Sequence, residues 1–450
     1  MMRIAPGDPT KRWYVLLLLG LLCTASVHAE NWPHWRGPRF NGSTPETGLP
    51  SNWSMTEGIK WRVPLPGSAA ATPIVWQDRV LLSGADTDRE MLLATCYDRK
   101  TGDRLWQHDI AEGIRRDRRS TYAAPSPVTD GKVVIFFYAS GDLVCFSLDG
   151  EQKWARNIHD DYGTFAFQWT FGGSPTLFDG RLYLQVLQRD VPVRGRGLSD
   201  QKNESYLLAM DPQTGETLWR HIRPSKARAE SREAFTSPLP FRLHGSWQML
   251  IAGGDAVTGH DPDTGREIWR WGTWNPRRIT HWRLVPSPVV GKDIVLVCAP
   301  KGSPVYAIEP AETGTLSDDA IAWTSEAVSR EVSADVPTPA FYDGDFFILN
   351  DLRGHLSRVD PLTGKVHWTT RTPGKAKYEA SPLAADGKIY LIDHAGEVAI
   401  VEAATGKLIR TISMDDPSGG DIVRASMAVS QGQLFIRTTD HLYCVEGVEQ

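Results

Sequence analysis

A nine-residue motif, Asp-x-x-Thr-Gly-x-x-x-Trp, recurs along this chain of 450 residues and constrains its fold more than any other feature. Full copies occupy 98–106, 211–219, 261–269 and 360–368, and weaker copies begin at Asp149, Glu309 and Glu402. Recurrence at a steady spacing is typical of proteins built from repeated structural units. The repeat therefore outweighs the chain length, which by itself would favour about three domains.

A second marker recurs in the same phase as the first. It is a Ser or Thr, usually followed by Pro, that opens an apolar stretch about every 50 residues. Its eight members are Thr72, Ser126, Ser174, Ser237, Ser287, Thr338, Ser381 and Ser426. Two independent markers in one phase indicate eight copies of one unit.

Each unit has the pattern of four short strands. In the second unit, apolar segments at 127–129, 132–137, 143–146 and 153–154 are separated by turn residues such as Asp130-Gly131 and Asp149-Gly150. No segment after residue 29 has sustained helical periodicity. Four-stranded units repeated eight times predict an all-β fold, an eight-bladed β-propeller of four-stranded antiparallel blades.

The two ends of the repeat region complement each other. The last unit has three strand patterns, near 427–430, 434–436 and 442–445, and no fourth. The segment 59–63 is a strand pattern without a unit, and Trp61 lies where the motif places its Trp. We expect this N-terminal strand to complete the last blade, which would close the ring and remove exposed sheet edges.

One Trp per unit fits a packing role, because an indole is large enough to fill the gap between neighbouring sheets. These predicted structural residues are Trp61, Trp106, Trp154, Trp219, Trp269, Trp323 and Trp368.

The first 29 residues have the pattern of a secretory signal. Lys11 and Arg12 precede an apolar run of about ten residues, too short for a membrane span of about 20, and cleavage after Ala29 fits the small residues there. A lipoprotein is not expected, because the large Leu22 precedes Cys23. The predicted organisation is 1–29 signal peptide, 30–58 lead-in segment and 59–450 a single propeller domain. We expect a monomer in the periplasm or outside the cell.

Composition excludes several function classes. The net charge of −5 argues against a nucleic-acid partner. Five Cys without a CxxC pair exclude a zinc ribbon and a disulfide-dense scaffold. The scattered His form no HxxxH pair, and no metal site is predicted.

The repeat resembles the tryptophan-docking repeat of the quinoprotein (PQQ-dehydrogenase-like) propellers, most closely over Ala209–Trp219, and the resemblance covers about 59–446. Trp32–Pro38 is similar to a lead-in of secreted bacterial members. That family includes quinone-dependent alcohol and sugar dehydrogenases and also non-enzymatic members such as the assembly factor BamB. The resemblance therefore implies the fold and leaves the function open.

Two functions follow from the resemblance. A dehydrogenase of this family would use PQQ with Ca²⁺, and many members carry a pair of adjacent cysteines over the quinone ring. This chain has neither adjacent cysteines nor a CxxCH haem site. The main prediction is therefore a BamB-like binding or scaffold module for envelope or secreted partners, with no cofactor. The alternative is a PQQ-dependent dehydrogenase of an alcohol or a sugar, so enzymatic activity stays undecided.

Two groups of residues are candidates for the functional site. Residues just before the Ser/Thr markers should surround the mouth of the central channel, as a small-ligand site or a hydrated funnel. They are Tyr122, Trp169, Glu233, Arg283, Asp335, Glu379 and Arg424. A basic face is expected on the same side of the disk, facing a protein partner or an anionic envelope polymer. It comprises Arg115, Arg116, Arg118, Arg119, Arg277 and Arg278.

Overall fold

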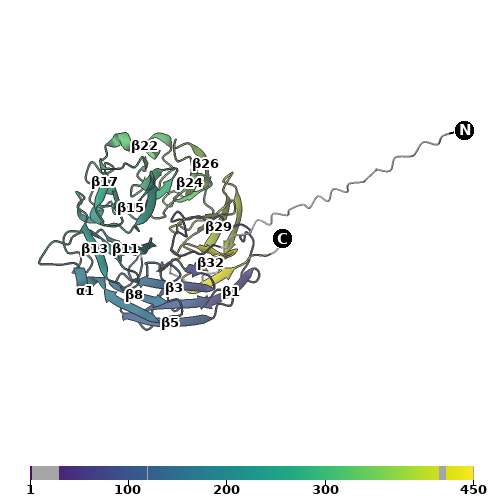
Figure 1. Ribbon diagram of the computed structural model, residues 1–450, viewed down its shortest axis with the longest axis horizontal. Helices are drawn as coiled ribbons and strands as arrows, with labels where there is room; N and C mark the ends of the chain where they lie inside the picture. Colours follow the sequence, from purple (N-terminus) through teal and green to yellow (C-terminus); the bar gives the residue numbers. More distant parts are fainter. Residues whose placement is uncertain (3–29, 119, 415–421, 449–450) are drawn as a thin grey trace.

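Eight antiparallel sheets surround a central axis in the computed structural model, which describes residues 1–2, 30–118, 120–414 and 422–448 (Figure 1). Blade 1 consists of β2 (Ile74–Trp76), β3 (Arg79–Asp86), β4 (Met91–Asp98) and β5 (Arg104–Glu112). Blade 2 consists of β6 (Val128–Thr129), β7 (Val133–Phe137), β8 (Asp142–Ser147) and β9 (Gln152–Asn157). Blade 3 consists of β10 (Thr176–Phe178), β11 (Arg181–Val186), β12 (Tyr206–Met210) and β13 (Thr217–Ile222). The predicted eight-bladed propeller is confirmed.

The remaining blades repeat this arrangement with one addition. Blade 4 consists of β14 (Leu239–Leu243), β15 (Ser246–Gly253), β16 (Ala256–His260) and β17 (Glu267–Trp271), and the short β21 (Gly314–Thr315) pairs parallel with β17. Blade 5 consists of β18 (Val289–Gly291), β19 (Ile294–Cys298), β20 (Val305–Ile308) and β22 (Ile321–Thr324). Blade 6 consists of β23 (Ala340–Tyr342), β24 (Asp345–Asn350), β25 (His355–Val359) and β26 (Val366–Arg371). Blades 7 and 8 consist of β27 (Leu383–Ala385), β28 (Lys388–Ile392), β29 (Glu397–Glu402) and β30 (Leu408–Ser413); and β31 (Ala428–Ser430), β32 (Gln433–Arg437), β33 (His441–Val445) and β1 (Ile59–Pro64).

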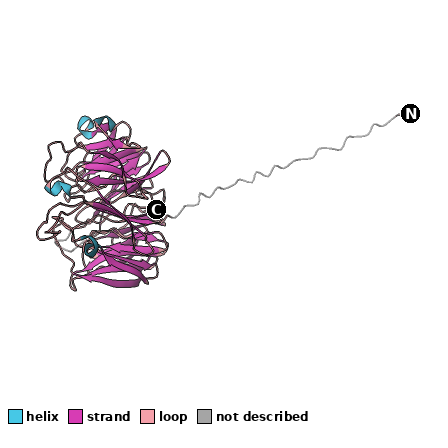
Figure 2. Ribbon diagram, turned by 60° about the vertical axis from the view of Figure 1, so that its left-hand side comes forward, coloured by secondary structure: helices cyan, strands magenta, loops and turns pink. Residues whose placement is uncertain are grey.

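Helices are short and lie between strands (Figure 2). They are α1 (Ile158–Tyr162), α2 (Ser325–Val328) and the 3₁₀ turns η1 (Ala229–Arg232) and η2 (Asp318–Ala320). No helix among the described residues has the length and apolar character needed to cross a bilayer. The predicted signal peptide lies almost wholly outside the described residues.

The inner and outer strands differ in burial because each blade packs on two neighbours. Every residue of β7, Val-Val-Ile-Phe-Phe, is buried, whereas β9 at the rim is exposed or half-buried throughout. Continuous apolar runs therefore form the inner strands, and mixed sequences form the rim.

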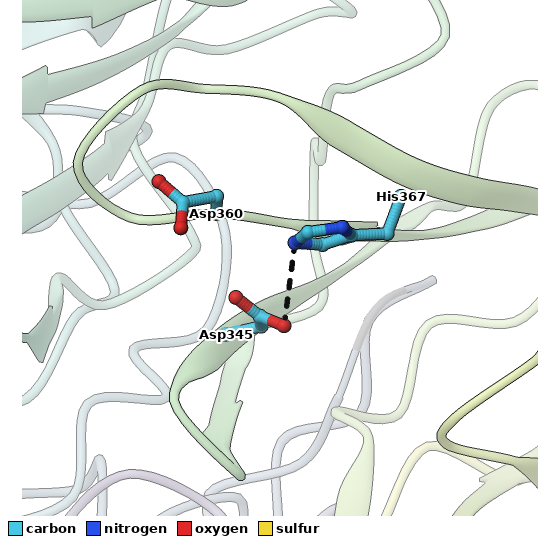
Figure 3. A group of neighbouring side chains, drawn as sticks. All are labelled: Asp345, Asp360 and His367. Carbon is cyan, nitrogen blue, oxygen red and sulfur yellow. Dashed lines mark ion pairs between the residues drawn. The ribbon is translucent and has the colours of Figure 1, made fainter.

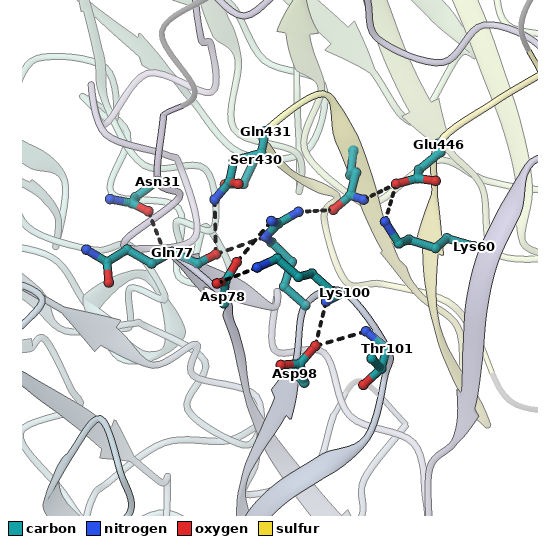
Figure 4. Close-up of polar contacts among 12 residues, drawn as sticks. Asn31, Lys60, Gln77, Asp78, Asp98, Lys100, Thr101, Ser430, Gln431 and Glu446 are labelled. Atoms are coloured by element: carbon teal, nitrogen blue, oxygen red, sulfur yellow. Dashed lines mark hydrogen bonds and ion pairs between the residues drawn. The ribbon is translucent and has the colours of Figure 1, made fainter.

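The first strand closes the ring as the sequence predicts. β1 pairs antiparallel with β33, with Trp61 opposite Cys444 and Val63 opposite Leu442. Polar contacts support the closure (Figure 4): Lys60 contacts Glu446 across the β1–β33 pairing, and Gln431 of blade 8 donates to the carbonyl of Gln77 in blade 1 at 3.1 Å. The closed ring leaves the eighth blade without an open edge on β33.

A belt of hydrogen bonds joins the eight Ser/Thr markers around the axis. The backbone N–H of each marker donates to the hydroxyl oxygen of the marker in the next blade, at 2.9–3.2 Å. The last of these bonds, from Ser426 to Thr72, completes the circle. Each hydroxyl keeps its own hydrogen, and among the described residues none of these hydroxyls donates to a protein acceptor.

The motif tryptophans join each blade to the next. Six of them donate from Nε1 to a backbone carbonyl of the following blade at 2.7–3.2 Å: Trp61, Trp106, Trp154, Trp219, Trp323 and Trp368. Trp269 instead donates to Gln248 of its own blade. Trp61, Trp269 and Trp323 are buried, and the other four are half-buried.

The lead-in segment crosses the end of the channel that lies beyond the hydroxyl belt. Trp32 pairs with Val75 of blade 1, and the N–H of Phe341 in blade 6 donates to the carbonyl of Asn41. Between them, the buried Arg36 donates to the carbonyls of Pro339 at 2.6 Å and Pro382 at 2.9 Å. This segment therefore plugs one end of the channel and leaves the other end as its mouth.

Candidate functional site

The central channel contains a cavity of about 190 Å³ that opens at the mouth. Seven of the eight belt residues line its wall, all except Ser287. Trp35 of the lead-in segment lines it beyond the belt, and Trp169, Arg283, Glu379 and Arg424 line it on the mouth side. The cavity therefore combines an indole floor, a belt of hydroxyl groups and a charged rim.

The structure brings together four of the seven predicted channel-mouth residues. Trp169, Arg283, Glu379 and Arg424 line the cavity, while Tyr122 lines a neighbouring side pocket of about 100 Å³ together with Trp169. The two others do not line either space. Glu233 and Asp335 are both buried behind the rim.

Glu379 is the centre of a charged cluster on the rim. Its carboxylate lies 2.7 Å from Lys377 Nζ, 2.9 Å from Arg424 Nε and 3.1 Å from His394 Nε2. Burial works against the ionised form, but hydrogen bonds from His394, Lys377 and Arg424 outweigh it and hold the pKa of Glu379 well below its usual range. The carboxylate is therefore ionised throughout the physiological range and holds these basic side chains at the mouth.

Glu233, which precedes blade 4, has a different environment from Glu379, which precedes blade 7. Its side chain is fully buried, it forms an ion pair with Arg189, and it accepts from the N–H of Gln168 at 3.2 Å. Burial raises the pKa of Glu233 to about 7, although Arg189 and the Gln168 N–H favour the ionised form. Gln168 adjoins Trp169, so this carboxyl supports the segment that forms one wall of the mouth.

Half of the predicted basic face gathers beside the mouth. Arg116 and Arg118 border two recesses, one of about 400 Å³ shared with Arg424 and one of about 640 Å³ shared with Trp169 and Arg194. Arg115 lines the side pocket with Tyr122. The other three residues are placed differently: Arg277 and Arg278 are exposed on the loop between β17 and β18, outside these recesses, and Arg119 lies outside the described residues.

Several residues of the site were not predicted. Neither Trp35, in the lead-in segment, nor Lys377, in a loop, is among the candidate residues predicted from the sequence. Lys377 lies two residues before Glu379 and close to the Ser381 marker. This short distance in sequence from the marker was the signal that could have placed Lys377 at the channel mouth. Asp351 and His394 follow second strands, in loops that share the mouth face with the segments before the markers.

In the part of the chain that the structure describes, one group of side chains has the residue types of a metal site: Asp345, Asp360 and His367 (Figure 3). It lies at the end of blade 6 away from the channel mouth, where β24 begins and β25 ends. Arg358 Nε is 2.6 Å from Asp345, and Lys292 Nζ is 3.8 Å from Asp360. Because basic side chains already balance both carboxylates, we assign no metal to this group.

Comparison with known proteins identifies the family. A family model described as "PQQ_2: Outer membrane protein assembly factor BamB" matches residues 52–170, 162–324 and 315–449. The chain belongs to the PQQ_2 family. The resemblance to PQQ-like propellers is therefore confirmed, while membership of a non-enzymatic, BamB-like branch is not.

Two relatives of this PQQ_2 protein are named as dehydrogenases. A polyvinylalcohol dehydrogenase of Pseudomonas sp. is 26% identical over 55% of this chain and 35% of its own length. A polyvinylalcohol dehydrogenase of Sphingopyxis sp. is 21% identical over 84% of this chain and 68% of its own length. The chain thus spans about a third of the first relative, and two thirds of the second.

A solved structure has the same fold. The quinohemoprotein alcohol dehydrogenase of Comamonas testosteroni superposes with a TM-score of 0.62 at 14% identity, over 93% of this chain and 81% of that one.

These comparisons overturn two predictions. The binding or scaffold function is wrong, because the two relatives matched by sequence are named as polyvinylalcohol dehydrogenases. The expectation that no cofactor is needed is wrong for the same reason.

Proposed function

We propose that this PQQ_2 protein is a quinone-dependent dehydrogenase that oxidises an alcohol in its central channel. The observation that carries the proposal is a channel closed at one end by Trp35 and rimmed at the other by Trp169, Arg283 and Arg424. Together with the dehydrogenase relatives, this arrangement favours a planar, anionic cofactor such as PQQ.

The rim has the chemistry that a quinone carrying carboxylates requires. Guanidinium groups bind carboxylates through paired hydrogen bonds. Arg283 and Arg424 place two guanidinium groups on the wall of the cavity. Indole faces stack on planar rings, and Trp169 and Trp35 lie at the two ends of the cavity. The hydroxyl belt adds donors for ligand oxygens. A bound quinone would supply the two-electron oxidation of the alcohol.

The volume of the site suggests how much of the mouth belongs to it. The cavity of about 190 Å³ is smaller than a typical ligand pocket of about 300–1,000 Å³. The adjoining recess of about 400 Å³ shares Ala70, Ser120 and Arg424 with the cavity. We therefore include Arg116 and Arg118, which line this recess, in the proposed site.

The residues of the mouth fit the quinone better than they fit its usual metal ion. Ca²⁺ binds six to eight oxygen ligands in proteins. Here Glu379 is surrounded by basic groups, Asp351 lies 2.9 Å from Lys377, and Glu233 pairs with Arg189. These carboxylates are already neutralised, so we derive no step through a metal ion.

The chain's own residues would bind, orient and shield the reactants. Arg283, which pairs with Glu230 at 3.3 Å, and Arg424, which Glu379 holds, are fixed in direction before a ligand arrives. Trp35 and the lead-in segment close the channel below the belt, which limits water to one entrance.

Export through residues 1–29, and binding of an anionic polymer by Arg115, Arg116 and Arg118, stay predictions. Neither is needed for the proposed activity. A charged rim attracts an anionic cofactor as well as an anionic polymer.

The decisive experiment is quinone binding and dye-linked oxidation by the purified protein. We expect PQQ to quench tryptophan fluorescence, and the loaded protein to reduce a dye with poly(vinyl alcohol) or with simple primary and secondary alcohols. Arg283→Ala and Arg424→Ala should each weaken PQQ binding about tenfold or more, the usual effect of losing a charge-assisted hydrogen bond. Arg277→Ala, outside the recesses, is the control. Absence of quenching at high PQQ concentration would overturn the proposal.

A further inference from the structure

A lysine ammonium group lies where the carboxylates of the channel mouth converge. Lys377 Nζ is 2.7 Å from Glu379 Oε1 and 2.9 Å from Asp351 Oδ2. The two carboxylates belong to different blades, since Asp351 follows β24 and Glu379 precedes β27. Their side chains are 0% and 2% exposed, so two buried anions share the half-buried ammonium group of Lys377.

We infer that the ammonium group of Lys377 occupies the position between Asp351 and Glu379 that a metal ion would otherwise take. This inference goes beyond the proposed function, because it holds whichever ligand the cavity binds.

Every oxygen of the two carboxylates already lies within 3.1 Å of a basic group or a backbone N–H. Asp351 Oδ1 accepts from the backbone N–H of Asp335 at 2.8 Å, and Asp351 Oδ2 contacts Lys377. Glu379 Oε1 contacts Lys377, and Glu379 Oε2 contacts both Arg424 and His394. A metal ion would have to displace Lys377, because no oxygen of this pair is left to turn toward it.

The electrostatics of the pair favour a charged lysine. Burial works against the charge, but the hydrogen bond to Glu379 and the nearby Asp351 carboxylate outweigh it, and the pKa of Lys377 is raised. An ammonium group is a compact charge with three donors, which suits two carboxylates that approach from different blades. Removing it would leave Asp351 without a basic partner among the described residues, beside a Glu379 carboxylate that Arg424 and His394 still contact, and a buried carboxylate without a partner strongly attracts a cation.

The test measures metal binding to the whole protein without any quinone. We titrate wild type with Ca²⁺ and with Tb³⁺, following the melting temperature and tryptophan-sensitised terbium luminescence. Lys377→Met should melt at a lower temperature than wild type, and Ca²⁺ or Tb³⁺ should raise that temperature by several degrees because the ion binds only the folded form. Lys377→Arg, which keeps the charge, should show no such gain.

Two controls make the result specific. Lys388→Met removes an ion pair with Asp386 away from the mouth and should give no response to metal. Adding Asp351→Asn to Lys377→Met should abolish the new response. The inference is overturned if wild type binds Ca²⁺ or Tb³⁺ and loses that binding on Asp351→Asn, or if Lys377→Met gains no metal response. Failure of PQQ binding alone would overturn the proposed function and leave this result standing.

Discussion

The turn glycine of each repeat is constrained both by its backbone and by its neighbour. Gly215 has φ +75°, and a Cβ placed on it would lie 2.7 Å from the ring of Trp154 in the preceding blade. The same contact joins Gly102 to Trp61 and Gly364 to Trp323. The Thr-Gly step therefore both turns the hairpin and provides the flat surface on which the neighbouring indole docks.

Gly215→Ala should destabilise the protein by about 2–5 kcal/mol, because the positive φ costs about 1–2 kcal/mol and the overpacked contact about 1–3 kcal/mol. The matched control is Gly180→Ala, where φ is +71° and nothing lies within 4 Å of the added Cβ. Chemical denaturation of both variants isolates the contribution of the indole contact. Equal losses of stability would show that the tryptophan contact contributes nothing.

Glu233 should make the stability of the protein depend on pH near neutrality. Its pKa is raised by burial to about 7 in the folded state, from an ordinary value of 4.5. The folded protein therefore retains a proton that the unfolded chain releases. This contribution to stability is complete below pH 4.5 and is lost as the pH rises through about 7.

Glu233→Gln tests this dependence, because glutamine does not titrate. Between pH 5 and pH 8 the melting temperature of wild type should fall relative to that of Glu233→Gln. The measurement is a series of thermal melts of both proteins in the same buffers. Parallel curves would mean that Glu233 has the same proton affinity in the folded and unfolded states.

At the scale of elements, the N-terminal segments have two separate tasks. β1 supplies the outer strand of blade 8, and the preceding lead-in segment seals the channel below the belt. The buried Glu46 links the two ends of the chain, because it accepts from the N–H groups of Gln431 and Gly432. The lead-in segment is therefore part of the propeller's packing.

Deleting residues 30–63 should leave the edge of β33 open and expose apolar surface, so the protein should aggregate. Deleting only residues 30–50 keeps β1 and should give a folded protein that melts at a lower temperature. Size-exclusion chromatography and thermal melts distinguish these outcomes. A monomeric product of the larger deletion with an unchanged melting temperature would contradict the role given to β1.

At the scale of the whole molecule, the sequence predicted the architecture because the repeat encodes it. The Ser/Thr markers and the Asp-x-x-Thr-Gly-x-x-x-Trp motif recur at equivalent places in each blade, and β1 fills the one missing place. The hydrogen bonds of the Ser/Thr markers could not be predicted in the same way, because they join residues of neighbouring blades and no single repeat contains both partners.

The site was harder to predict because its residues depart from the repeat. Lys377, Asp351 and His394 occur once each, in loops of different blades, and only the closed ring brings them around Glu379. The scaffold prediction failed for a related reason. It relied on the lack of adjacent cysteines and of a haem motif, and a missing motif says little when the binding groups are scattered over the loops of several blades.

The pairing of β1 with β33 also dictates the order in which the protein can fold. Residues near 60 find their partners only near 440, so the ring cannot close until almost the whole chain has been synthesised. Contacts so distant in sequence form slowly. Until then β1 has no partner strand and the lead-in segment lacks most of its contacts. The growing chain should therefore depend on chaperones for longest at its N-terminal segments.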